Sequence, residues 1–274
     1  MHPHFTALDA AYQLHYYLSF KTHFLKPFFA DCRAPSLVES VLNDVCDRER
    51  YHLLETNIDQ EHLRLLVSLL PTQTVVDTVK RLKGNLQNQF RKELNIHDLW
   101  ARGYFASSSG TVDQLRVQRY IDSQISHHGF RGEWTRPLKY LNPHFKTPAY
   151  EFAHCVSLLK YHLVFVTQNR IAVFDEAIAP SLFDYIVAVG KRREFAVERI
   201  SLLPDHMHML IEGVPSISVQ DYAFAILNNT QQWMAKNYSG VLKATGAWNV
   251  WQQSYYAGTV GEYTTGQVKS FLRG

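Results

Sequence analysis

The sequence has little of what marks secreted, membrane-spanning or zinc-ribbon proteins. Its 274 residues contain only three cysteines, Cys32, Cys46 and Cys155. No CxxC pair is present, which argues against a zinc ribbon and against a disulfide framework. No apolar run approaches the roughly 20 residues of a membrane helix, and the first residues lack the layout of a secretion signal. We therefore expect no membrane association and a cytoplasmic location.

An excess of charge of one sign is also missing, since 28 basic and 25 acidic residues give a net charge of +3. That balance does not by itself indicate a nucleic-acid partner. Local clusters are more informative, and the clearest is formed by Lys80, Arg81 and Lys83. A solvated helix face would produce the same cluster, so these three residues are candidate nucleic-acid contacts only.

The chain contains an internal repeat at a shift of about 145 residues, and such a repeat must be recognised before a fold is assigned. Similar segments occur in the same order in both halves. The aligned pairs are 14–22 with 159–167, 34–38 with 179–183, 59–66 with 203–210, and 99–105 with 250–256. We therefore expect two copies of one domain.

The pattern of the second copy predicts alternating strands and helices. We expect strands at 161–167, 195–203, 206–213 and about 251–259, and helices from Pro180, over about 219–237 and at the end of the chain. This order predicts an α+β fold with an antiparallel sheet covered by helices. The segment between the copies is rich in glycine and proline and is expected to be a linker. The predicted divisions are domain 1–126, linker 127–152 and domain 153–274.

Two histidines carry the first chemical signal. His206 and His208 lie two apart in a predicted strand, so both side chains point to the same face. Two neighbouring imidazoles can bind one divalent metal, although the His-x-His pattern alone is a weak signal. Asp205, which precedes the pair, either orients one of the histidines or closes the turn before the strand.

A tyrosine near the end of a predicted helix carries the second signal. Tyr120 and Gln124 are four residues apart and therefore share a helix face. A tyrosine hydroxyl is a weak nucleophile, but a metal that polarises a phosphate lowers the barrier to its attack. The glutamine carbonyl on the same face can supply an oxygen ligand. An ordinary amphipathic helix would also account for this spacing.

Together these motifs resemble the HUH single-tyrosine transposases, which include insertion-sequence transposases that move as single strands and REP-associated tyrosine transposases. The resemblance rests on Leu-Pro-Asp-His-Met-His at 203–208, on a Trp and a Tyr-Tyr pair at 251–256, and on the Tyr120 helix. It implies ferredoxin/RRM-like domains. It also implies metal-dependent cleavage of single-stranded DNA with hairpin ends, through a 5′-phosphotyrosine on Tyr120. Mg²⁺ or Mn²⁺ would be held by His206, His208 and Gln124.

Each half departs from the family pattern, and the losses are complementary. The first half has His62 and Arg64 in place of the histidine pair, and a guanidinium stays protonated and cannot coordinate a metal. The second half has Phe271 in place of the tyrosine, and phenylalanine has no hydroxyl. We therefore expect a degenerate site at His62, Arg64 and Phe271, and one composite site that unites the Tyr120 helix with the second half's histidines.

The expected assembly is a monomer in which the two halves pack as a pseudo-twofold dimer. The alternative is a catalytically inactive regulator or scaffold that binds hairpin or single-stranded DNA. The sequence also leaves open whether the protein is a mobile-element transposase or a domesticated enzyme. The sequence gives neither the DNA target nor the physiological metal.

Overall fold

A computed structural model describes residues 4–123, 138–143, 145, 150–152, 155–246 and 249–273. Its first half contains a four-stranded antiparallel unit with two long helices on one face. The elements are β2 (His15–Lys21), α1 (Ala34–Glu49), β3 (His52–Ile58), β4 (His62–Ser68), α2 (Val75–Leu94) and β5 (Tyr104–Ser109). Short 3₁₀ turns at His23–Leu25 and Phe28–Ala30 lead into α1.

The second half repeats this order. Its elements are β8 (Cys155–Thr167), α5 (Ala179–Arg192), β9 (Phe195–Leu203), β10 (His206–Gly213), α6 (Val219–Asn237), α7 (Ser239–Thr245) and β11 (Trp251–Val260). A 3₁₀ turn at Gln168–Arg170 precedes α5. The predicted bounds of 195–203, 206–213 and 219–237 are confirmed. The first strand begins earlier than predicted, because its start pairs with the other half.

One 11-stranded sheet runs through both halves in the order β3-β4-β2-β5-β8-β10-β9-β6, with β11 between β8 and β1 (Asp9–Gln13). Pairing within each half is antiparallel. Two parallel ladders join the halves, β1 with β11 and β5 with the start of β8. The mixed α+β fold with two tandem domains is thus confirmed.

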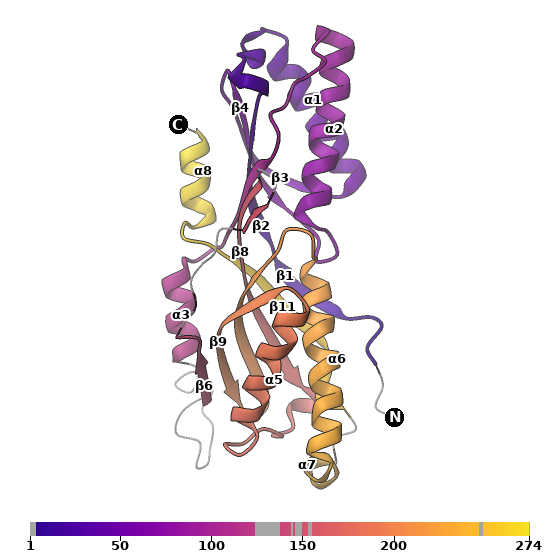
Figure 1. The fold of residues 1–274 in the computed structure, drawn as a ribbon, viewed down its shortest axis with the longest axis vertical. Coiled ribbons are helices and arrows are strands. Elements are labelled where there is room, and N and C mark those ends of the chain that lie inside the picture. Colours follow the sequence, from indigo (N-terminus) through magenta and orange to yellow (C-terminus); the bar gives the residue numbers. More distant parts are fainter. Residues whose placement is uncertain are drawn as a thin grey trace.

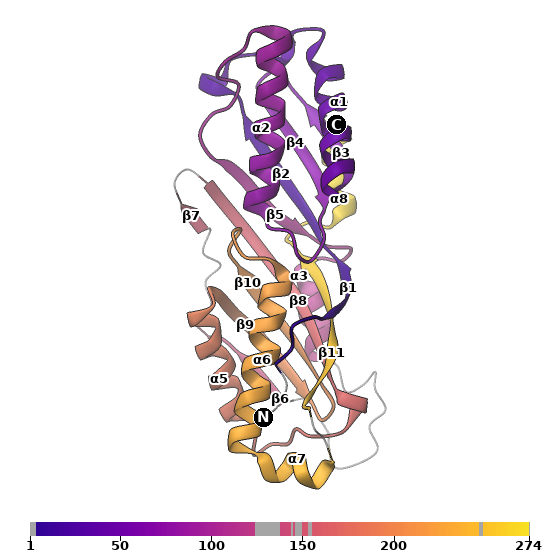
Figure 2. The same ribbon diagram turned by 90° about the vertical axis from the view of Figure 1, so that its right-hand side faces the viewer.

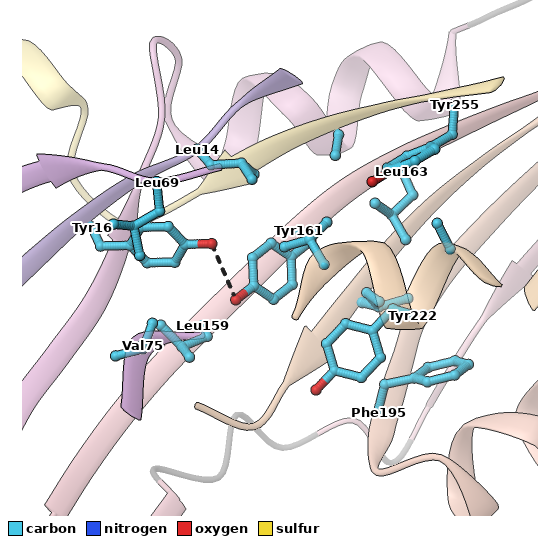
Figure 3. Packing of buried hydrophobic residues seen from close by; sticks show 14 of the residues in the cluster. Leu14, Tyr16, Leu69, Val75, Leu159, Tyr161, Leu163, Phe195, Tyr222 and Tyr255 are labelled. Carbon is cyan, nitrogen blue, oxygen red and sulfur yellow. Dashed lines mark hydrogen bonds between the residues drawn. The ribbon is translucent and has the colours of Figure 1, made fainter. Parts of the chain in front are cut away.

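The two parallel ladders occupy equivalent positions in the repeat, so the halves are related by a pseudo-twofold axis. Tyr16 and Tyr161, which the repeat aligns, meet near this axis with their hydroxyl oxygens 3.5 Å apart (Figure 3). Both rings are almost completely buried, and this burial raises the pKa of each hydroxyl. The core is therefore continuous across the junction, as in a dimer whose subunits share one sheet.

Helices cover both faces of the sheet unequally. The long helices α1, α2, α5 and α6 lie along one face, with the two halves stacked end to end (Figures 1 and 2). Two short helices, α3 (Gln114–Asp122) and α8 (Thr265–Arg273), lie on the opposite face (Figure 1). Side-chain caps fix the start of α2, α3 and α6, where Thr74, Asp113 and Ser218 accept backbone N–H bonds.

The segment predicted as a linker contributes two short strands to the sheet. β6 (Leu138–Leu141) pairs with β9, and β7 (Tyr150–Phe152) pairs with the start of β8. Most of the remaining linker, including Arg131 and Arg136, lies outside the described residues. The domain boundaries themselves stay a prediction. In the described part of the chain, no helix has the length and apolarity needed to cross a membrane.

Candidate active site

The two short helices each dock on the half of the molecule that does not contain them. α3 follows the last strand of the first half yet packs against β9 and β10 of the second half. α8 follows the last strand of the second half yet packs against β3 and β4 of the first. The arrangement brings the helix of Tyr120 to the strand that carries His206 and His208.

Side-chain contacts hold α3 in this position. Gln118 Nε2 donates to Glu198 Oε1 at 2.6 Å, and Arg199 Nη1 lies 2.5 Å from Asp122 Oδ2. The apolar side of the helix contributes Val117 and Ile121 to a small buried cluster with Leu210 and Val260. The middle and the C-terminal end of the helix are thereby fixed against the second half's sheet.

The ring of Tyr120 lies beside two histidine rings of the second half. Its centroid is 5.6 Å from that of His208 and 6.2 Å from that of His162, edge-on in both cases. His206 and His208 share a strand face, and their centroids are 5.2 Å apart. The histidines are almost fully buried, whereas Tyr120 is 42% exposed. A ligand can therefore reach the tyrosine from solvent.

His206 is oriented by a buried carboxylate. Asp205 Oδ1 lies 2.5 Å from His206 Nδ1, and Arg170 Nη1 lies 3.2 Å from the other carboxylate oxygen. Burial raises the pKa of Asp205, but its contacts with His206 and Arg170 outweigh burial and lower that pKa overall. An ionised carboxylate can only accept, so His206 Nδ1 carries the proton. Its Nε2 is then the nitrogen with a lone pair for a metal.

His162 is a site residue that the sequence interpretation left without a role. Its Nε2 lies 3.0 Å from His208 Nδ1, and the two rings are nearly parallel. Burial lowers the pKa of His162 to about 4, which keeps the ring neutral near pH 7. A neutral ring can accept a hydrogen bond at Nε2. His162 can therefore orient the ring of His208 in the way that Asp205 orients the ring of His206.

The remaining predicted metal ligand, Gln124, lies outside the described residues. Among the residues that the structure does describe, no group of three or more His, Cys, Asp or Glu side chains is arranged to hold a metal ion. The donor set seen here is therefore two imidazoles, each with its other ring nitrogen near an acceptor on the protein. That arrangement fits a metal-ligating pair.

The equivalent place in the first half has a different chemistry. Arg64 Nη1 donates to Asn57 Oδ1 at 3.0 Å and to Asp59 Oδ2 at 2.7 Å, and His62 Nδ1 lies 3.2 Å from Asp59. Phe271 on α8 is 67% exposed. Together with Tyr17 and Phe105, it lines a cavity of about 810 Å³. Arg64, ion-paired with Asp59, thus replaces the second histidine, and Phe271 beside a cavity replaces the tyrosine.

The basic cluster predicted to contact DNA lies on α2, on the sheet face opposite α3 and α8 (Figure 1). Lys83 Nζ donates to the carbonyls of Ala101 and Gly103 at 3.0 and 2.9 Å, and burial lowers its pKa. Arg81 pairs with Glu49 at 3.0 Å, and Lys80 is exposed. Lys83 is thus engaged in the fold, and a DNA contact by Lys80 or Arg81 stays a prediction.

Comparison with known protein families identifies both halves. A family model described as "Transposase IS200 like" matches twice, over residues 10–124 and over residues 155–274. The chain belongs to the IS200-like transposase family. The first match includes Tyr120, and the second includes His206 and His208. This confirms the resemblance inferred from the motifs and the internal duplication of a transposase domain.

Two curated transposases are similar to parts of this IS200-like chain. The ISDra2 transposase TnpA of Deinococcus radiodurans is 25% identical over 114 residues, which are 42% of this chain and 81% of that protein. The transposase for insertion sequence element IS200 of Salmonella typhimurium is 26% identical over 95 residues, or 32% of this chain and 62% of that protein. Each alignment is shorter than either match of the family model.

A solved structure is also similar. It is a REP-associated tyrosine transposase bound to a REP hairpin, with 12% identity and a TM-score of 0.31, covering 43% of this chain and 70% of that one.

Proposed function

We propose that this transposase-family protein is a metal-dependent endonuclease and strand transferase for single-stranded DNA with one composite active site. The observation that carries the proposal is the placement of Tyr120, from the first half, 5.6 Å from the ring of His208 in the second. The equivalent helix brings Phe271 to a half that has Arg64 instead of a second histidine. Only one of the two places unites a hydroxyl with a histidine pair.

The proposed reaction is attack by Tyr120 on a phosphodiester. A bond forms between the tyrosine Oη and phosphorus, and the bond from phosphorus to the 3′ oxygen breaks. The proton of the hydroxyl ends on the departing 3′ oxygen, which leaves a free 3′-hydroxyl and a 5′-phosphotyrosine. A second 3′-hydroxyl can reverse the step and join two strands without ATP. The exposed edge of Tyr120 gives a strand access.

His206, His208 and Gln124 would hold the ion. Imidazoles combined with an amide oxygen suit Mn²⁺, and they accept Mg²⁺ when the other ligands are oxygen. When bound, the ion would polarise the scissile phosphate and stabilise its developing charge. Asp205 fixes the ring orientation and tautomer of His206, and His162 does the same for His208. Replacing Asp205 or His162 should leave both histidine ligands in place but make the orientation of one imidazole ring less well fixed.

The proposed working form is a monomer with domains at 1–126 and 153–274. In a homodimer of this kind the helix exchange would need two chains, whereas here both halves are already tethered. The shared sheet and the buried tyrosine pair fix them against each other.

The partner is single-stranded DNA, with hairpin ends expected from the family resemblance. Binding should weaken as salt rises, because phosphate contacts release counterions.

The test is cleavage of labelled oligonucleotides by the purified full chain. We expect Mg²⁺- or Mn²⁺-dependent nicking of a hairpin-bearing single strand, a covalent protein–DNA product, and no reaction with EDTA. Plain duplex of the same sequence should be a poorer substrate. Hairpin binding with no covalent product under any of these metals would instead identify a regulator that binds DNA without cleaving it.

A further inference from the structure

The two exchanged helices are held by ion pairs of opposite polarity. Arg199 Nη1 on β9 lies 2.5 Å from Asp122 Oδ2 of α3. Glu55 Oε2 on β3 lies 2.7 Å from Arg273 Nε of α8. The strand carries the cation in one pair and the anion in the other.

The four residues occupy equivalent positions in the repeat. Asp122 follows Tyr120 by two residues, and Arg273 follows Phe271 by two. Arg199 pairs across the sheet with Leu210, and Glu55 pairs with Leu66; each contact borders a register shift in its ladder. Leu66 and Leu210 are aligned by the repeat. Arg199 and Glu55 therefore occupy the same position of the repeat, and the charge at that position is opposite in the two halves.

The loops that lead into the two helices cross at one place. The loops before α3 and α8 run side by side, with Gln114 N donating to Gly261 O at 3.1 Å and Thr265 N donating to Gly110 O at 2.7 Å. A Cβ on Gly261 would lie 2.2 Å from Ser108 O, and one on Gly110 would lie 2.5 Å from Thr259 O. Both loops thus pass through one crossing, and the ion pairs of the docked helices lie beyond it.

We propose that these ion pairs are positioning contacts that specify the helix exchange. If each helix docked on its own half, Asp122 would face Glu55 and Arg273 would face Arg199, which makes two like-charge pairs. Arg199 and Glu55 have side chains only 14% and 19% exposed, so solvent screens such pairs incompletely. Like charges that oppose the wrong partner are a general source of specificity. The consequence for catalysis rests on the proposed function, whereas the docking preference does not.

The decisive variant exchanges the strand charges alone, E55R/R199E. It makes both pairs of the observed arrangement repulsive and both pairs of the alternative attractive, at constant net charge. Spin labels on Arg119→Cys of α3 and Ser40→Cys of α1 report which half α3 occupies, in a background with Cys32 and Cys155 replaced by serine. We expect a new, shorter distance and a fall in covalent product of about tenfold or more.

Two further variants separate specificity from simple stabilisation. Adding D122R/R273D to the first variant reverses all four charges and should restore the original single distance and the covalent product. The variant D122R/R199D keeps the local ion pair but makes both helices basic and both strands acidic. We expect it to keep its thermal midpoint near that of the parent and to show both distances, whereas a merely stabilising pair predicts the parent distance alone.

The outcomes are distinct. An unchanged distance in E55R/R199E overturns the proposal, as does failure of the four-charge variant to recover. If E55R/R199E does not fold, D122R/R199D decides the matter, because two distances support the proposal and the parent distance alone overturns it. A parent protein with the expected distance but no covalent product refutes the proposed function and leaves the docking inference standing.

Discussion

The two halves share a fold and differ in what they place beneath the exchanged helix. The second half offers three buried histidines, of which two are oriented by neighbours, and receives a tyrosine. The first half offers an arginine bound to Asp59 and receives a phenylalanine beside an open cavity. Because the helices are exchanged, α8 with its Phe271 packs against the half that carries Arg64. The two losses therefore fall in the same half of the molecule. The tyrosine and the histidine pair thus meet in the second half, whereas the phenylalanine and the arginine meet in the first.

The largest predicted effect on covalent product distinguishes α3, which carries Tyr120, from α8, which carries Phe271. Tyr120→Phe should lower covalent product about a thousandfold or more, because the attacking oxygen is removed. The matched variant Phe271→Tyr should add no second adduct, because the histidine pair is absent there. Denaturing gel analysis of a 5′-extended oligonucleotide would measure both. An adduct that survives in Tyr120→Phe would assign the nucleophile elsewhere.

The next prediction compares the two strands that carry histidines. His206→Ala and His208→Ala should each reduce cleavage about a hundredfold or more, as loss of electrostatic stabilisation at a reacting phosphate does. His62→Ala should leave cleavage within about twofold, because the His62 imidazole lies 3.2 Å from Asp59 and has Arg64 rather than a second histidine beside it on the strand. Titration with Mn²⁺ should show the same contrast in metal affinity. Equal damage from His62→Ala would mean that the first half is active.

A smaller effect is expected from His162, whose repeat partner is Tyr17. His162→Ala should lower metal affinity and cleavage about tenfold, as loss of a ligand's hydrogen-bond partner typically does. His162→Gln, which can still offer an acceptor, should recover part of that loss, whereas Tyr17→Phe should have little effect. If His162→Ala and His162→Gln behave alike, the orienting role is wrong.

The smallest effect concerns pH and a buried acid that the first half lacks. Glu212 is fully buried near Lys160 and Glu198, and burial raises its pKa to about 7. Its folded-state pKa therefore exceeds the usual 4.5, so the folded state holds a proton that the unfolded chain releases. The free energy of unfolding should fall as pH rises from about 4.5 through 7. Ser68 occupies the aligned position in the first half.

The matched test is Glu212→Gln, which should flatten this slope and stabilise the protein above pH 7. Urea unfolding at pH 5 and pH 8 would measure it, with Ser68→Ala as the control expected to leave the slope intact. A Glu212→Gln protein with the parent's pH slope would mean that another group titrates.

Many of the strands and helices could be predicted from local sequence patterns. The strand at 206–213 and the helix at 219–237 have the bounds that their periodicity and caps predicted. The role of His162 was missed because it depends on the register between β8 and β10, which places it diagonally across from His208. No local pattern encodes that register.

Two other features depend on long-range pairing. β6 and β7 are only four and three residues long, so their strand character comes from the longer strands beside them. The face of the sheet on which α2 lies, and hence the direction of Lys80 and Arg81, follows from chain crossover rather than from charge pattern. The prediction that α3 is exchanged rests on the complementary losses in the two halves together with the family resemblance.

The most direct test of the central claim is to map the covalent adduct in the full-length protein over a range of protein concentrations. After reaction with a hairpin single strand and Mn²⁺, peptide mass spectrometry should place a single nucleotide adduct per chain on Tyr120. The first-order rate should not depend on protein concentration, since both parts of the site belong to one chain. An adduct on another tyrosine, or a rate that rises with protein concentration, would contradict a composite site within the monomer.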